Sequence, residues 1–259
     1  LLLFWTITHL VRRLVVPDGK EAEMTWSQYL AVFGSGVAGA LAFTWSDTFW
    51  YSAVEAEVYA FSSFCTALVF WLILKWENRA DEANSDRYLI LIAYVIGVSI
   101  AVHLLNLLCI PAIVLVFYYR KWKETSVKGS LMALGVSFVI IALILYGLVP
   151  GFVNAAQMVE LFCVNTLGLP YNSGVLLYTI IDFVVFGWCL YELYRQQNAM
   201  RIKVSFMAAV VLSGMLFLGG GWFIPTVLIL ALGIYLFRYC KRIPVRILTI
   251  TALSILVIF

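Results

Sequence analysis

The sequence predicts an all-α polytopic membrane protein. The chain has 259 residues, of which 64% are hydrophobic and 12% are charged, and its mean hydropathy is +0.99. Soluble domains are about 45–50% apolar and about 25% charged, so a water-soluble fold does not explain this composition. The apolar runs are long and lack the alternation of apolar and polar residues that marks an outer-membrane barrel.

Apolar runs follow one another along the whole chain, and each run is a candidate membrane helix. A helix needs about 20 apolar residues to cross a bilayer, and somewhat fewer where it is short or buried in protein. We therefore expect about ten transmembrane helices in a single transmembrane domain, 1–259. The runs are 1–11, 28–44, 58–74, 88–102, 104–119, 129–149, 173–191, 204–218, 222–237 and 247–259.

Both ends of the sequence interrupt apolar runs. The chain starts at Leu1 with neither Met nor a positively charged signal start, and it stops at Phe259 within a run. We therefore expect it to be a fragment of a longer chain, truncated at both ends.

The basic residues divide the connecting segments into two sides. If each run crosses once, all 17 Lys and Arg residues follow the first, third, fifth, seventh and ninth runs, on one side. The positive-inside rule makes this side cytoplasmic. The other side carries acidic residues and a histidine, namely Asp47, Glu55, Glu57, Glu160 and His103.

The segment from Trp45 to Phe61 is the first candidate for a functional site. It holds three carboxylates, Asp47, Glu55 and Glu57, and six aromatic residues, without any Lys or Arg. Carboxylates are costly near lipid, and at this density they favour a proton, a metal ion or a donor-rich ligand. The alternatives are a favourable first-turn charge for one acid and an interfacial belt for the rings, which also suit stacking on a sugar or an isoprenoid chain.

Two further polar positions stand within apolar runs. His103 and Asn106 lie at the tip of a tight helical hairpin on the acidic side. There His103 either caps a helix or faces water, or it binds a phosphate or metal or carries a proton. Asp182, near the middle of a run, either bonds a neighbouring helix or serves as an ion- or proton-coupling site.

The run from Gly34 to Gly39 spells a dinucleotide-binding fingerprint. It lies inside an apolar run without a preceding strand, so the context that the motif needs is absent. We interpret these small residues as positions where two helices approach closely.

The stretch Phe49 to Ala60, which ends in Glu57-Val58-Tyr59-Ala60, and the run Gly97 to Pro111 carry a family resemblance. In order and spacing they resemble a bacterial membrane-protein family, common in Bacteroidota, that is related to protein O-mannosyltransferases. The resemblance implies a GT-C glycosyltransferase fold. It covers about residues 30–119, and the remainder is similar only as apolar helices.

Within this resemblance, Glu57 matches the family's glutamate most directly, and Glu55 and Asp47 match less well. These three are the catalytic candidates. The family's main acidic motif, on the first external loop, would lie upstream of Leu1, so the catalytic base cannot be named. The substrate-binding candidates are His103, Asn106, Trp50 and Tyr59.

The resemblance implies an enzyme that moves a mannose-like sugar from a polyprenyl-phosphate carrier to a protein or lipid acceptor on the non-cytoplasmic face. It implies a bacterial inner-membrane location, with acidic periplasmic loops, and the lipid bilayer as surroundings; no nucleic acid is expected. No cofactor is certain, although an acidic surface could hold a divalent metal through oxygen ligands. The alternative is a transporter or flippase that uses Asp182, and perhaps Glu160, as coupling groups.

Overall fold

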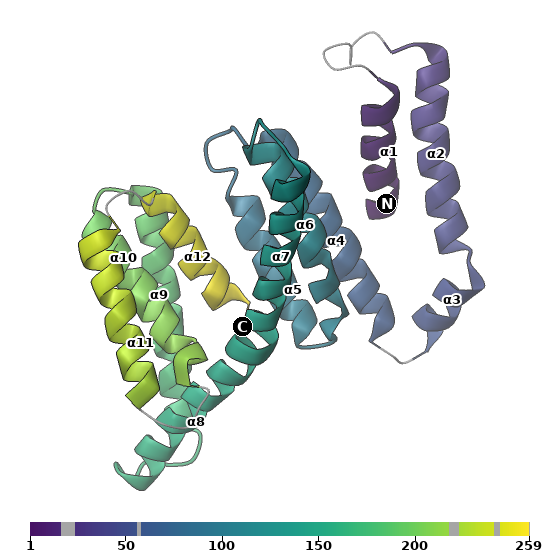
Figure 1. Ribbon diagram of the computed structural model, residues 1–259. Helices are drawn as coiled ribbons and strands as arrows, with labels where there is room; N and C mark the ends of the chain where they lie inside the picture. Colours follow the sequence, from purple (N-terminus) through teal and green to yellow (C-terminus); the bar gives the residue numbers. More distant parts are fainter. Residues whose placement is uncertain (17–23, 56–57, 218–222, 241–243, 259) are drawn as a thin grey trace. The chain divides into compact units, whose positions relative to one another are not determined.

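The computed structural model is built from helices (Figure 1). It describes residues 1–16, 24–55, 58–217, 223–240 and 244–258, and these contain no strand. The all-α fold class is therefore confirmed. The contacts divide the chain into two compact units, Leu1–Ser137 and Phe138–Phe259. The prediction of one transmembrane domain stays a prediction.

Unit 1 begins with two helices that pack along each other, α1 (Leu2–Val15) and α2 (Trp26–Thr44). At the start of α2, Thr25 and Gln28 form a reciprocal capping box, which satisfies backbone N–H groups that the helix leaves unpaired. A Cβ atom added to Gly36 would lie 2.5 Å from the Thr8 side chain of α1. The interpretation of this glycine as a close-packing position is confirmed.

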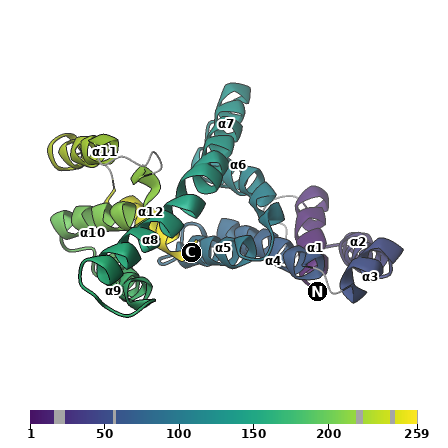
Figure 2. The same cartoon turned by 90° about the horizontal axis from the view of Figure 1, so that it is seen from below.

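The centre of unit 1 is α4 (Tyr59–Arg79), which lies between α1 and α5 (Arg87–Ile100) in Figure 2. It also contacts η2 (Leu104–Cys109) and α6 (Ile110–Lys121), and α7 (Val127–Leu143) follows. The Trp76 side chain of α4 is fully buried and stacks on Phe117 of α6, with ring centroids 5.1 Å apart. Lipid tails are as apolar as leucine, so such interfaces are stabilised mainly by close packing.

Unit 2 is organised around α9 (Ser173–Arg195), which contacts α8 (Val149–Asn165), α10 (Ala199–Leu212) and α12 (Val245–Val257). The other elements of the unit are η3 (Ile144–Leu148), η4 (Met215–Phe217), α11 (Phe223–Ile234) and η5 (Tyr235–Tyr239). A buried cluster of Ile202, Leu236, Cys240 and Leu248 joins α10, η5 and α12.

Four of the described helical segments are long and apolar enough to cross a membrane, or five if the bent pair of α2 and α3 (Asp47–Val54) is one span. Three further apolar helices are shorter. A polytopic membrane protein is thus confirmed, whereas about ten crossings stays a prediction. The four segments are Tyr59–Arg79, Leu104–Lys121, Val127–Asn165 and Ser173–Arg195.

The stretch between the predicted runs 129–149 and 173–191 is mostly helical and not a simple connecting segment. It is helical through Asn165, as part of the run Val127–Asn165. Pro150 stands in the first turn of α8, where a missing N–H is tolerated, and the π-helical turn η3 precedes it. Pro150 therefore does not end the helical run, which passes from α7 through the π-helical turn η3 into α8.

Candidate substrate site at the acidic end of unit 1

The two ends of unit 1 differ in charge. At one end α1, α4 and α6 each finish in basic residues, with Arg13, Arg79 and Lys121 in their last turns. The other end holds α3, the start of α4 and η2, and its carboxylates are Asp47 and Glu55 among the described residues. The basic end also carries acids, among them Glu77 and Asp81, so the two ends differ in their basic residues. Which end faces the cytoplasm stays a prediction.

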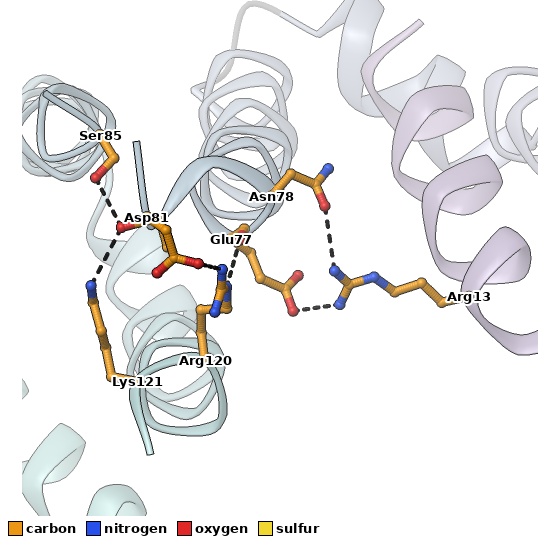
Figure 3. Close-up of polar contacts among 8 residues, drawn as sticks. Arg13, Glu77, Asn78, Asp81, Ser85, Arg120 and Lys121 are labelled. Carbon is orange, nitrogen blue, oxygen red and sulfur yellow. Dashed lines mark hydrogen bonds and ion pairs between the residues drawn. The ribbon is translucent and has the colours of Figure 1, made fainter. Parts of the chain in front are cut away.

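A polar network holds the basic ends of three helices together (Figure 3). Arg13 of α1 forms an ion pair with Glu77 of α4 and donates a hydrogen bond to Asn78 at 3.3 Å. Arg120 of α6 forms an ion pair with Asp81, and its Nε donates to the Glu77 carbonyl at 2.9 Å. The cations also complement the partial negative charge at the end of α4. The network therefore fixes which helices meet at this end.

At the acidic end, α3 presents one face to an open depression of about 600 Å³. Ser46 caps the helix by accepting a hydrogen bond from the Phe49 N–H at 3.4 Å. Asp47, Trp50, Tyr51 and Val54 follow the helical spacing i, i+3, i+4, i+7, and Glu55 completes the lining. Three of the predicted site residues, Asp47, Trp50 and Glu55, therefore border the same depression. Tyr51 and Val54 were not among the predicted ligands, although the spacing could have identified them.

The most direct match to the family's motif, Glu57, lies outside the described residues. Glu55 ends α3 with an extended backbone, at φ −64° and ψ 140°. The helix therefore does not continue through Glu55. The catalytic assignment of Glu57 stays a prediction.

Tyr59 and His103 lie side by side. Their ring centroids are 5.4 Å apart, with Tyr59 at the start of α4 and His103 before η2. The Nδ1 atom of His103 accepts a hydrogen bond from the Leu105 N–H at 3.0 Å, so the capping interpretation of this histidine is confirmed. A neutral imidazole that accepts at Nδ1 carries its proton on Nε2. His103 can therefore cap η2 and still offer one N–H donor to a ligand.

Asn106 lies away from any surface. Its side chain is fully buried, and its Oδ1 accepts hydrogen bonds from Thr66 at 3.4 Å and from the Cys109 thiol at 3.1 Å. The buried Nδ2 has no hydrogen-bond partner in the described part of the chain. These contacts join η2 to α4 and explain the residue by packing. Its assignment to substrate binding stays a prediction.

The two acidic residues that the transporter alternative needs lie in unit 2. Glu160 of α8 accepts three backbone hydrogen bonds at the start of α9, from the N–H groups of Asn172 at 2.6 Å, Gly174 at 2.8 Å and Val175 at 3.0 Å. This contact gives Glu160 a structural role as a cap. Asp182 of α9 is partly buried, and its Oδ1 has no hydrogen-bond partner among the described residues.

A metal site was considered at the acidic end. Asp47 and Glu55 provide carboxylate oxygens, which suit a hard divalent cation. Among the described residues, however, no group of three or more His, Cys, Asp or Glu side chains is placed to hold a metal ion. The described residues therefore supply at most part of a ligand set, and a divalent metal stays a prediction.

The helices and the charged ends define the chain as an all-α polytopic membrane protein with an acidic, aromatic depression on unit 1. Residues 1–126 match the sequence model of a family described as protein O-mannosyl-transferase TMEM260 N-terminal domain. This match includes every predicted site residue and supports a relation to protein O-mannosyltransferases. No curated protein and no solved structure matches the chain.

Proposed function

We propose that the protein is a membrane glycosyltransferase of the GT-C type. It moves a mannose-like sugar from a polyprenyl-phosphate carrier to a protein or lipid acceptor on the non-cytoplasmic face of a bacterial inner membrane. The observation that carries the proposal is the match of residues 1–126 to a protein O-mannosyltransferase domain. The arrangement at the acidic end of unit 1 supports it independently.

The reaction needs a base for the acceptor and a place for the sugar. A carboxylate removes the proton from the acceptor hydroxyl while that oxygen attacks the anomeric carbon, and the bond to the carrier phosphate breaks. Asp47 and Glu55 border the depression, and Glu57 follows closely in sequence. We assign the base role to one of these carboxylates, and Glu57 is the first candidate because it matches the family's glutamate most directly.

The remaining groups at this end suit the donor. Trp50 and Tyr51 are 58% and 73% exposed beside the carboxylates, so their rings are available to stack on a sugar or an isoprenoid unit. The Nε2–H of His103 is a hydrogen-bond donor for the leaving phosphate, and the Tyr59 ring beside it restricts the imidazole. The acidic end thus offers a base, apolar stacking surfaces and one phosphate donor.

The transporter alternative rests on Asp182 alone. Its buried, unpartnered oxygen is the kind of group that couples ion movement in membranes. Glu160, the other coupling candidate, is engaged by three backbone N–H groups. This engagement favours the glycosyltransferase over the transporter.

The choice of donor tests the proposal. The intact protein, reconstituted in liposomes, is given a hydroxyl-bearing peptide and mannose linked either to polyprenyl phosphate or to a nucleotide. We expect labelled peptide from the lipid-linked donor only. Transfer from the nucleotide donor alone would contradict the proposed carrier. Movement of the lipid-linked sugar across the bilayer without transfer would instead establish the transporter.

A further inference from the structure

The acidic end of unit 1 carries more carboxylates than the proposed reaction uses. Asp47 and Glu55 line the depression, and Glu57, which lies outside the described residues, follows two positions later in sequence. Sugar transfer needs one base for the acceptor hydroxyl, and Glu57 is the first candidate for it. Asp47 and Glu55 are then available to recognise a substrate.

Unit 1 provides no cation beside these two carboxylates. Both side chains are exposed, and neither has an ion pair or a hydrogen bond among the described residues. α3 packs against α2 and α4 (Figure 1). α2 contains no charged residue, and the first cation of α4 is Lys75, about 24 Å along the helix from Tyr59. The undescribed residues after Glu55 are Ala56 and Glu57, which add no positive charge. Unit 1 therefore gives the depression a negative potential.

The negative potential distinguishes between the two substrates. The carrier phosphate of the donor is an anion, so Asp47 and Glu55 would repel it. His103, which can offer its Nε2–H, is the group at this end that suits the phosphate. The acceptor must bring its hydroxyl to the sugar beside Trp50 and Tyr51, which lie between the two carboxylates along α3. The depression therefore suits an acceptor segment that carries positive charge.

The spacing of the carboxylates matches a spacing in an extended peptide. Asp47 and Glu55 are eight positions apart along α3 and its C-cap, which corresponds to about 12 Å at about 1.5 Å per residue. An extended peptide advances about 3.3 Å per residue, so the same distance spans about four residues. Residues two apart in an extended chain point to the same side. A hydroxyl residue with basic residues two before and two after it therefore presents all three side chains to the depression.

The surface between the carboxylates also suits basic side chains. Trp50 and Tyr51 are exposed there, and Val54 is 76% exposed. Lys and Arg pack their apolar stems on such a surface while the charged heads stay in water. Their heads are also attracted to the face of an aromatic ring. One face of α3 thus offers rings and a valine for the stems and carboxylates for the heads.

We propose, on the basis of the proposed function, that the depression selects polypeptide acceptors whose hydroxyl residue has a Lys or Arg two positions away on each side. Asp47 pairs with one cation and Glu55 with the other, while the hydroxyl between them faces the sugar. These two carboxylates are specificity-determining residues, and the proton transfer belongs to Glu57. The acceptor is then a basic polypeptide segment and not a lipid.

Three acceptor peptides of equal length test the proposal. The first has Lys two positions before and after its single Thr, the second has Lys directly before and after the Thr, and the third has Gln in place of Lys. Fluorescence anisotropy measures their binding to the intact protein in a neutral detergent, and kcat/KM measures transfer from the lipid-linked donor in liposomes. The variants are Asp47→Asn and Glu55→Gln. The matched control is Glu82→Gln, an exposed acid that does not line the depression. Circular dichroism establishes that each variant keeps its helices.

We expect the first peptide to exceed the neutral peptide about tenfold in affinity and in kcat/KM, because two exposed ion pairs contribute about two- to fivefold each. It should also exceed the second peptide, which has the same net charge, so that difference reports the spacing. Asp47→Asn and Glu55→Gln should each reduce the preference about two- to fivefold, and Glu82→Gln should leave it unchanged. The ratio between peptides is the readout, because a catalytic role of either acid would slow transfer to all three equally.

Two results would overturn the proposal. One is equal binding of the three peptides, and the other is a preference that Asp47→Asn and Glu55→Gln leave unchanged or that Glu82→Gln reduces as much. Binding with the expected preference but without sugar transfer would support the recognition of basic segments and contradict the proposed function instead.

Discussion

The contact between α1 and α2 yields a prediction that one added methyl group can test. Gly36 faces α1, and a Cβ atom there would lie 2.5 Å from Thr8 Cγ2 and 3.0 Å from the Phe4 ring. Gly34, two residues earlier on the same helix, has no atom within 4 Å of an added Cβ. Both Gly36→Ala and Gly34→Ala add one methyl group to the same helix. At Gly36 the methyl group meets α1, whereas at Gly34 it meets no other atom.

The surroundings of Gly36 have little freedom to adjust. The Thr8 hydroxyl donates hydrogen bonds to the carbonyl groups of Phe4 at 2.9 Å and Trp5 at 3.0 Å, which hold its rotamer. Rotation of Thr8 to make room would break these bonds, so the helices must separate instead. Gly39 differs, because its added Cβ would meet the end of the Ile7 side chain at 2.6 Å, and that end can rotate away.

The expected magnitude follows from two opposing terms. Replacing a helical glycine with alanine gains up to about 1 kcal/mol in helix propensity at either position. Overpacking a filled interface costs about 1–3 kcal/mol; Gly36 incurs this cost in full, Gly39 in part and Gly34 not at all. We expect Gly34→Ala to be neutral or stabilising and Gly36→Ala to be the less stable of the two by about 1–3 kcal/mol. Gly39→Ala should fall between them.

The assay is equilibrium unfolding in mixed micelles with increasing dodecyl sulfate, followed by tryptophan fluorescence and far-ultraviolet circular dichroism. Propensity terms cancel in the comparison of Gly36→Ala with Gly34→Ala, so the difference reports the interface. Equal midpoints for the two variants would refute the close approach of α1 and α2.

Three further predictions concern other contacts. Glu160→Ala should lower the thermal midpoint of the protein, because three backbone N–H groups at the start of α9 lose their acceptor; an unchanged midpoint would argue against this cap. Ala53→Cys should react with a membrane-impermeant maleimide in intact cells, and Glu82→Cys should react only after permeabilisation. The five natural cysteines are buried and should contribute little labelling. Labelling of both variants in intact cells would contradict the proposed sidedness. Asp182→Asn should retain the wild-type rate of sugar transfer, and a large loss would bring this residue into the mechanism.

The sequence places the C-terminal ends of α1, α4 and α6 on one side of unit 1. Composition alone indicates membrane helices, and the placement of Lys and Arg assigns each helix end to one of two sides. In the structure, Arg13, Glu77 and Arg120 meet at one end, as that assignment requires. The pairing of α1 and α6 with α4 could not be predicted, because it depends on contacts between residues more than 40 positions apart.

Local patterns also explain where the predictions for single residues differ from the structure. The predicted run 129–149 stops before Pro150, but this proline lies in the first turn of α8, where the helix tolerates it. Asn106 is near His103 in sequence, but its side chain is buried against α4 whereas His103 caps the start of η2.

The most direct test of the proposed function is the initial rate of mannose transfer from the polyprenyl-phosphate donor by the protein with Glu57→Gln. Glu82→Gln serves as the control, since Glu82 is an exposed acid at the opposite, basic end. Removing a catalytic carboxylate costs about 100-fold or more in rate. The account predicts such a loss for Glu57→Gln and a wild-type rate for Glu82→Gln. A wild-type rate for Glu57→Gln would contradict it and remove this glutamate from the active site.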